Sequence, residues 1–289
     1  MLGVRRAGVT DPRDDSMMLS PTLARTPFAG GELSAVARTG NRAARVTTFM
    51  FETWSRLAAR GAVSPREKAR EASWVSENAC ALHGVRPSVR GQVPNQPCVL
   101  VANHISYFDP VVLSSFVPLT AVAKREVGGW PVIGEVSRKL GTLYVTREDA
   151  HSGARCLREA MRALEAGVSV LVFPEGTTTH GDSVLPFKRG IFGVAARMNV
   201  PVVPVSLRYD CPEVAWVGDE SFLPHYMRSM TRACTRVNVR FMEPLSVPTV
   251  ADAADVAEAA RRSITRGLWM DSFASSASSV HAAWHLVSA

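Results

Sequence analysis

The chain lacks the short motifs that mark several large enzyme groups. It contains no G-x-G-x-x-G dinucleotide fingerprint, no P-loop, no H-E-x-x-H zinc motif and no G-x-S-x-G nucleophile elbow. Its five cysteines form no C-x-x-C pair, and an odd, scattered set argues against a zinc site or a disulfide scaffold. We expect most of them to be small buried hydrophobic side chains in a reducing compartment.

Long apolar runs are also missing. No uninterrupted apolar stretch approaches the roughly 18 residues that a membrane-spanning helix needs. The first thirty residues lack the apolar core of a secretory signal. We therefore expect a protein that is cytosolic or lies on the cytoplasmic face of a membrane without crossing it.

The composition is that of a globular protein with a basic surface. Of 289 residues, 46% are hydrophobic and 20% charged, which excludes disorder along the whole chain. The net charge of +7 suits anionic partners such as phospholipid headgroups, nucleotide-like cofactors or nucleic acid. Ordinary solubilising charge is the alternative interpretation.

The N-terminal quarter predicts an amphipathic two-helix segment. Residues 1–40 are polar and are expected to form a poorly ordered leader. Within 41–84, Val46, Met50, Trp54 and Leu57 recur on one helical face with arginines around them, and a second helix follows over 65–83. Such a segment either lies in a lipid headgroup layer or packs on its own domain.

From residue 85 onward, apolar runs alternate with helical patterns. The apolar run over 98–102 is followed by a polar loop and by a helix that is expected from Pro110. Further strands are expected over 119–123, 142–145, 168–173, 202–207 and 237–241, and further helices over 131–140, 152–166, 190–199 and 251–270. This alternation predicts an α/β domain over 85–271, with a single mostly parallel or mixed sheet flanked by helices. The Ser/Ala-rich residues 272–289 are expected to form a flexible tail.

Three polar loops each follow an apolar run directly. They span residues 103–109, 146–149 and 174–179. In open α/β sheets, ligands bind outside the carboxyl ends of the strands. We therefore expect the three loops to face one crevice, which makes this crevice the candidate functional site.

The first loop offers a base and a partner for it. A neutral imidazole at His104 could accept a proton, and Asp109 could fix its tautomer and stabilise the imidazolium. The spacing alone is weak, and Asp109, followed by Pro110, also suits a helix N-cap. Ser106 lacks the setting of a nucleophile, so the base would act on a substrate hydroxyl.

The third loop and nearby cations suit an anionic or polar ligand. Gly176 allows backbone amides to approach a ligand, and Glu175 could accept hydrogen bonds from substrate hydroxyls or stand solvated in a turn. Arg147, Lys188 and Arg189 would bring positive charge suited to phosphate, or would remain ordinary surface charges.

Taken together, these loops resemble the motifs of the glycerophospholipid acyltransferase family, which includes the 1-acylglycerol-3-phosphate acyltransferases. Four blocks within about 85–245 match: 101–109 resembles N-H-x4-D, 141–147 resembles G-x-x-[FY]-[IV]-x-R, 173–177 resembles F-P-E-G-T, and 200–205 resembles the proline-containing fourth block. The segment Leu185–Gly190 also fits. Four blocks in order make a chance match improbable.

The resemblance implies transfer of an acyl chain from acyl-CoA or acyl carrier protein to a lysolipid hydroxyl, with 1-acylglycerol-3-phosphate as the leading acceptor. His104 would be the base and Asp109 its partner, while Arg147 and Glu175 would bind the acceptor. The remaining substrate-binding positions implied are Gly176, Thr177, Lys124 and Lys188. No metal or other cofactor is expected, because a thioester is already activated. A membrane-borne acceptor would suit the amphipathic segment.

One position departs from the family pattern. The family commonly has Arg after F-P-E-G-T, where it can hold the acceptor phosphate, and this chain has Thr178. An acceptor without a terminal phosphate, such as lyso-ornithine lipid, is therefore an alternative, although Lys124, Arg125, Arg147 and Lys188 could substitute. A non-catalytic lipid-surface protein is a second alternative. Nucleic-acid binding is not expected, since no recognition motif is present.

Overall fold

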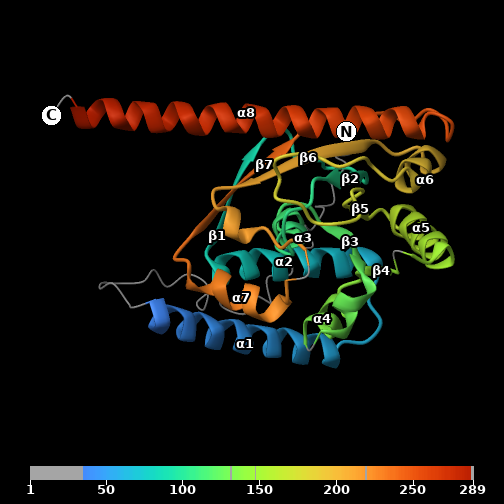
Figure 1. The fold of residues 1–289 in the computed structure, drawn as a ribbon. Helices are drawn as coiled ribbons and strands as arrows, with labels where there is room; N and C mark the ends of the chain where they lie inside the picture. The colour runs from blue at the N-terminus through green and yellow to red at the C-terminus, as the bar shows by residue number, and fades with distance from the viewer. Residues whose placement is uncertain (1–34, 131, 147, 219, 288–289) are drawn as a thin grey trace, which may run out of the picture. The chain divides into compact units, whose positions relative to one another are not determined.

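The computed structural model describes residues 35–287, apart from positions 131, 147 and 219 (Figure 1). For 35–36 and 272–287 it describes the backbone alone. Most of the expected leader therefore lies outside the described residues. Helix α1 begins at Ala35, six residues before the predicted start of the helical segment.

A single seven-stranded sheet forms the centre of the fold. Its strands are β1 (Val85–Arg90), β2 (Val99–Ala102), β3 (Leu119–Lys124), β4 (Leu143–Val145), β5 (Ser169–Val172), β6 (Val202–Tyr209) and β7 (Thr235–Phe241). Their order is β1-β7-β6-β2-β5-β3-β4, and every pair is parallel except β6 with β7. The prediction of one mixed, mostly parallel sheet is confirmed.

The central strand shows why the apolar runs fold in this way. All four residues of β2 are buried, and alternate side chains enter two different cores. Leu100 and Ala102 belong to one core, and Val99 and Val101 to the other. A parallel strand covered on both faces is apolar at every position, so these residues form a continuous run in the sequence.

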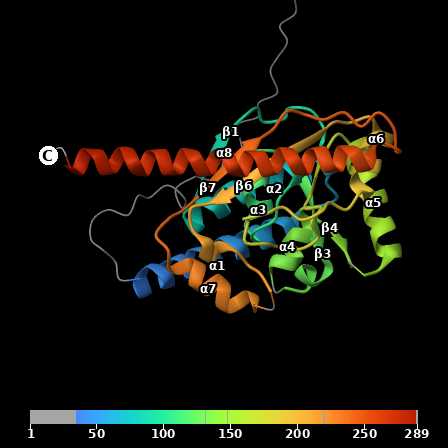
Figure 2. The ribbon, with the colours of Figure 1, turned by 45° about the horizontal axis from the view of Figure 1, so that its top comes forward.

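Helices cover both faces of the sheet (Figures 1 and 2). One core includes side chains of α2 (Pro65–His83) and α3 (Asp109–Ser114); the other includes side chains of α5 (Ala150–Glu165), α6 (Gly190–Met198) and α8 (Ala253–Val287). Two further helices, α4 (Ile133–Lys139) and α7 (Phe222–Thr231), lie beside α1 (Ala35–Ala59). Short 3-10 helices span Arg125–Gly129 and Pro212–Val214.

The last helix is longer than expected. The sequence predicted a helix ending at residue 270 and a flexible tail over 272–289, whereas α8 continues to Val287. No glycine or proline follows Gly267, so nothing in the sequence interrupts the helical backbone. The boundary at 270 was therefore wrong.

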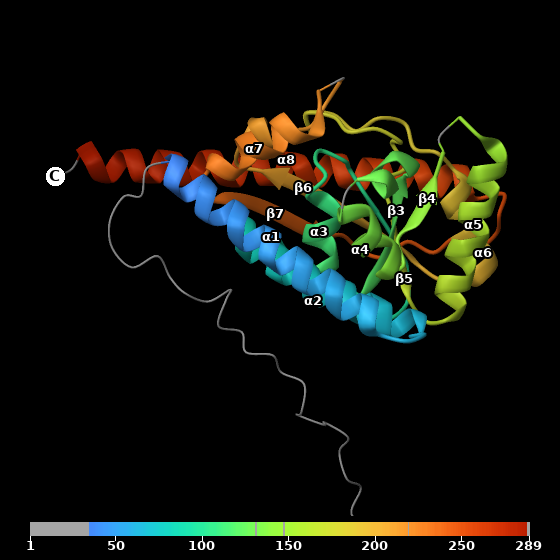
Figure 3. The ribbon, with the colours of Figure 1, turned by 90° about the horizontal axis from the view of Figure 1, so that it is seen from below.

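Helices α1 and α2 run side by side along the molecule (Figure 3). A capping box begins α2, in which Glu67 N–H donates to Ser64 Oγ and Ser64 N–H donates to the Glu67 carboxylate. Gly84 ends α2 in the left-handed region at φ 70°. Of the predicted apolar face of α1, Val46 and Leu57 are buried in the protein, while Trp54 is exposed.

The arginines of α1 serve the fold. The buried Arg42 guanidinium donates to three carbonyl oxygens at the end of α7, those of Met230, Arg232 and Ala233, at 2.5–3.2 Å. Met230 lies in the last turn of α7, where carbonyls have no partner within the helix, and Arg232 and Ala233 follow its end. Arg42 therefore joins α1 to the end of α7. Burial lowers the pKa of Arg42 from its ordinary value.

Two more arginines hold α1 against α2. Arg56 lies over the Trp74 ring, with its guanidinium carbon 4.4 Å from the ring centroid, and pairs with Glu71. Arg60 reaches the other oxygen of Glu71 at 3.0 Å. Arginines that the sequence pattern left free for lipid headgroups thus make contacts within the protein, although Arg60 stays exposed at the surface. No helix in the described part of the chain combines the length and apolarity needed to span a bilayer.

Candidate active site

The three polar loops meet at one cavity of about 460 Å³ at the carboxyl ends of β2, β3, β4 and β5. Its lining includes His104 from the first loop, Thr146 and Asp149 from the second, and Gly176 from the third. The parallel direction of these strands places their carboxyl ends together, as the sequence led us to expect. Arg147 lies outside the described residues.

His104 forms a short contact with Asp109. The His104 Nδ1 atom lies 2.8 Å from Asp109 Oδ2. Because an ionised carboxylate only accepts hydrogen bonds, the proton of the neutral imidazole lies on Nδ1, and Nε2 then carries the lone pair. Among the described residues, no group hydrogen-bonds Nε2, and His104 lines the cavity. The ring is therefore arranged as a base toward the cavity.

Asp109 is buried and accepts four hydrogen bonds. Besides the imidazole, Oδ2 accepts the backbone N–H groups of Ile105 (2.6 Å) and Ser106 (2.9 Å). The other oxygen, Oδ1, accepts the Tyr209 hydroxyl at 2.8 Å. Helix α3 begins at Asp109, and its N-cap residue is Phe108. The Asp109 side chain accepts hydrogen bonds from the preceding loop, so the interpretation of Asp109 as an N-cap was wrong.

Tyr209 was not singled out from the sequence. It lies at the end of β6, beside β2, two residues beyond the predicted end of its strand. Burial, followed by the neighbouring Asp109, raises the pKa of Tyr209 well above its ordinary value. The hydroxyl therefore stays protonated and remains a donor to the carboxylate.

The Glu175 turn (residues 174–179) holds the backbone of His104 on both sides. The Glu175 carboxylate accepts the His104 N–H at 2.8 Å through Oε1 and the Leu185 N–H at 2.9 Å through Oε2. The Thr179 N–H donates to the His104 carbonyl at 2.8 Å. Both Glu175 oxygens therefore bind backbone amides, whereas the sequence suggested hydrogen bonds with substrate hydroxyls.

Glu175 is buried, and burial is the main reason that its pKa is raised; its two backbone hydrogen bonds and His104 act in the opposite direction. Directly before the turn, the Phe173 ring stacks on the His104 ring with centroids 4.0 Å apart and planes 15° apart. The imidazole is thus positioned by a carboxylate at its edge, a ring on its face and two backbone hydrogen bonds.

The other predicted substrate-binding residues also line the cavity. Gly176 has φ of +75°, and a Cβ there would lie 3.0 Å from Lys188 Nζ, so both backbone and space favour glycine. Thr177 is exposed at the cavity, and Lys124 ends β3 there with its ammonium 3.2 Å from Glu126. Arg125, in contrast, is exposed in the following 3-10 helix and does not line the cavity.

Thr178 has a structural role in place of the family's arginine. Its hydroxyl donates to the Trp216 carbonyl, and the Trp216 N–H donates to the Ile105 carbonyl at 2.9 Å. The Glu175 turn, the His104 loop and the segment before α7 are thereby joined. Trp216 also lines the cavity, which no motif in the sequence indicated.

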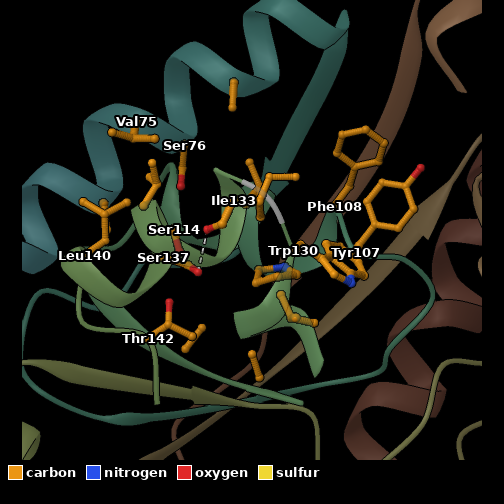
Figure 4. Close-up of a pocket in the computed structure, with 18 of the residues that line it drawn as sticks. Val75, Ser76, Tyr107, Phe108, Ser114, Trp130, Ile133, Ser137, Leu140 and Thr142 are labelled. Atoms are coloured by element: carbon orange, nitrogen blue, oxygen red, sulfur yellow. Dashed lines mark hydrogen bonds between the residues drawn. The ribbon is translucent and has the colours of Figure 1, made fainter. Parts of the chain in front are cut away.

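A second cavity of about 270 Å³ adjoins the first (Figure 4). It is lined mostly by apolar side chains of α1, α2, α3, β3 and α4, including Val75, Ile133 and Leu140. Tyr107 and Pro110 line both cavities, as do Val122, Ala123 and Val127. An apolar compartment therefore lies directly beside the His104 cavity.

Within the described residues, no group of three or more His, Cys, Asp or Glu side chains is arranged to hold a metal ion. The polar groups around His104 are instead committed to each other and to backbone amides. What this arrangement can do is remove a proton from a hydroxyl placed at Nε2.

Comparison with known proteins shows which family the chain resembles. The family described as Acyltransferase matches residues 85–208. The lyso-ornithine lipid O-acyltransferase of Pseudomonas aeruginosa is 31% identical over 202 residues, covering 68% of this chain and 77% of that protein. The 1-acyl-sn-glycerol-3-phosphate acyltransferase of Neisseria gonorrhoeae is 29% identical over 170 residues, covering 58% and 67%.

The same fold occurs in a solved structure. The crystal structure of the 1-acyl-sn-glycerophosphate (LPA) acyltransferase, PlsC, from Thermotoga maritima aligns with a TM-score of 0.62 and 22% identity, covering 82% of this chain and 95% of that one. The family match and the Pseudomonas aeruginosa relative define the class of protein as an acyltransferase. The chain belongs to the acyltransferase family, and the resemblance found in the sequence motifs is confirmed.

The two roles suggested for Glu175 predict different kinetics. Glu175→Gln replaces one acceptor oxygen with an NH₂ group, which cannot accept a backbone N–H. If Glu175 positions His104, we expect kcat to fall about 10- to 100-fold, because small misplacements of a reacting group are costly. The KM for the lysolipid acceptor should stay within about twofold. Steady-state kinetics over acceptor concentration measures both.

Glu165→Gln, at an exposed position on α5, is the matched control and should leave both constants unchanged. Thermal unfolding of each variant checks that the fold is retained. A raised acceptor KM with an unchanged kcat would instead show that Glu175 binds the acceptor.

Proposed function

We propose that the protein transfers an acyl chain from a thioester donor to the hydroxyl of a lysolipid. The observation that carries this proposal is the His104 ring, fixed by Asp109 and presenting Nε2 to the cavity. Nε2 takes the proton of the acceptor hydroxyl, and the oxygen attacks the thioester carbonyl. The thiolate then leaves and recovers the proton from the imidazolium, so a new ester replaces the thioester.

No covalent enzyme intermediate or metal is needed in this scheme, because the thioester is already activated. Both donor classes, acyl-CoA and acyl carrier protein, present the same thioester to the acceptor oxygen. Holding the donor and the acceptor in one cavity supplies proximity. The apolar cavity beside Tyr107 offers a dry compartment for an acyl chain while the headgroup stays near His104 (Figure 4).

We propose that the acceptor is a lysolipid without a phosphate headgroup, of the lyso-ornithine type. Two observations support this choice. The Pseudomonas aeruginosa relative carries that activity in its name, and Thr178 offers a hydroxyl bound to Trp216 where the family commonly has an arginine for phosphate. Without a guanidinium there, a bidentate phosphate contact is lost.

The second candidate acceptor is 1-acylglycerol-3-phosphate. It is favoured by the ammonium groups of Lys124 and Lys188, which both line the cavity and could neutralise a phosphate. The Neisseria gonorrhoeae relative carries this activity in its name. The two candidates share the same transfer chemistry and differ only in the headgroup that the cavity accepts.

We further propose that α1 and α2 rest on the cytoplasmic surface of a membrane, where both donor classes are available. Phe51 is 63% exposed on α1, with Trp54 beside it and Trp74 exposed on α2. Because Arg42, Arg56 and Arg60 already contact other groups of the protein, we assign the main attraction to these apolar side chains.

Removal of the base tests the transfer mechanism. His104→Ala should lower kcat about 10²- to 10⁴-fold, the usual contribution of general base catalysis, with folding intact. Acyl transfer from labelled acyl-CoA and acyl carrier protein to a panel of lysolipids measures it. His151→Ala, an exposed histidine on α5, is the control. Full activity without the His104 ring would refute the assignment.

Position 178 tests the acceptor. Thr178→Arg should raise kcat/KM for 1-acylglycerol-3-phosphate relative to lyso-ornithine lipid about tenfold or more, because a charge-assisted hydrogen bond contributes about 1.5–3 kcal/mol. Thr178→Val removes the hydroxyl without adding charge and serves as the control. An unchanged ratio in Thr178→Arg would contradict a role for this position in acceptor choice.

Vesicle binding tests the membrane contact. Phe51→Ser combined with Trp54→Ser should weaken partitioning into vesicles of phosphatidylglycerol and phosphatidylethanolamine about tenfold or more, since each ring contributes apolar area. Co-sedimentation with the vesicles measures the fraction of each variant that is bound. The control, Thr47→Ala with Ser55→Ala, changes exposed polar positions of the same helix. Equal partitioning of both variants would exclude this face of α1.

A further inference from the structure

A second groove opens on the side of the molecule formed by α5, α6 and the start of α8. Its volume is about 560 Å³, and its lining combines arginines with apolar side chains. The arginines are Arg158, Arg189 and Arg197. The apolar lining comes from Leu157, Met161, Val194 and Val250, together with alanines and glycines. None of the three arginines lines the His104 cavity.

The three arginines are available to a ligand. All three are exposed, and in the described part of the chain no ion pair or side-chain hydrogen bond engages them. The nearby Asp252 accepts two hydrogen bonds from Thr249. Three exposed arginines without partners among the described residues, around one partly apolar groove, form a surface suited to an anionic partner.

The arginines extend beyond the groove along α5. Arg155, Arg158 and Arg162 are exposed at helical spacing, which spreads their charges over about 10 Å along one side of the helix. A row of separated charges beside an apolar strip matches an amphipathic helix with several carboxylates. It does not match the compact charge of a single phosphate.

The groove is continuous with the candidate active site. Leu157 and Gly190 line both the groove and the His104 cavity. Lys188, which lines the His104 cavity, directly precedes Arg189 of the groove in the chain. A partner seated in the groove could therefore extend a flexible thioester-bearing arm into the cavity.

We propose that this groove docks the acidic helix of an acyl carrier protein and thereby delivers the acyl donor. The lining carries no aromatic ring, side-chain amide or hydroxyl that would recognise the adenosine of coenzyme A. Apolar side chains between arginines instead suit the apolar face and carboxylates of a helix. The inference rests on the proposed function, since it assigns the donor for that reaction.

The test compares two donors carrying the same acyl chain. Arg158→Glu combined with Arg197→Glu should raise KM for acyl carrier protein about tenfold with kcat unchanged, because surface charges act on encounter. KM for acyl-CoA should stay within about twofold. Arg236→Glu with Arg266→Glu, two exposed arginines elsewhere on the molecule, is the charge-matched control and should change neither constant.

An acyl carrier protein with reversed charges tests whether the arginines contact its carboxylates directly. Acyl carrier protein with two helix carboxylates changed to Lys should regain activity with Arg158→Glu/Arg197→Glu and lose it with the unmodified protein. An equal rise in KM for both donors, or no rise for acyl carrier protein, would overturn the proposal.

Binding measured without turnover separates this inference from the proposed function. Holo-acyl carrier protein should bind the unmodified protein and the His104→Ala variant equally in calorimetry, and bind Arg158→Glu/Arg197→Glu about tenfold more weakly. No binding to the unmodified protein would overturn the docking surface. Loss of binding in the charge-reversed variant supports the groove even if no lysolipid is acylated, an outcome that would contradict the proposed reaction alone.

Discussion

The hydrogen bond between His104 and Asp109 is the constraint on which the site depends. Asp109 can orient the ring because its other hydrogen bonds hold it in place, and these come from the His104 loop and from Tyr209 on β6. A buried carboxylate with four donors is stable only while all four are present. The orientation of one imidazole thus depends on strands β2 and β6 being neighbours, which makes fold and site inseparable.

Much of this fold could be predicted from the sequence, for a physical reason. Buried parallel strands are continuous apolar runs, and their carboxyl ends lie at one edge of the sheet, so the convergence of three loops could be expected. Strand β1 and helix α7 were missed. In β1, Val85–Arg90 alternates apolar and exposed polar residues and contains Pro87, which weakens a strand pattern at the sheet edge.

The site could be predicted only in part. The residues His104 and Asp109 are close in sequence, so their pairing could be proposed from spacing and chemistry. The role of Glu175 could not, because it depends on which backbone amides the fold brings to its oxygens. Likewise, nothing local in the sequence shows that Thr178 binds the carbonyl of Trp216, 38 residues away.

The contacts of the positively charged side chains, likewise, could not be predicted from the sequence. The sequence places arginines around the apolar face of the N-terminal helical segment, where contact with lipid headgroups was one of two interpretations. In the structure, Arg42, Arg56 and Arg60 satisfy carbonyls, a carboxylate and an aromatic ring, so those charges hold α1 on the domain. Arg56 and Arg60 share Glu71, which offsets part of their charge. The exposed Arg158, Arg189 and Arg197 instead line a groove that shares residues with the His104 cavity, so they are the arginines that the proposed docking would use.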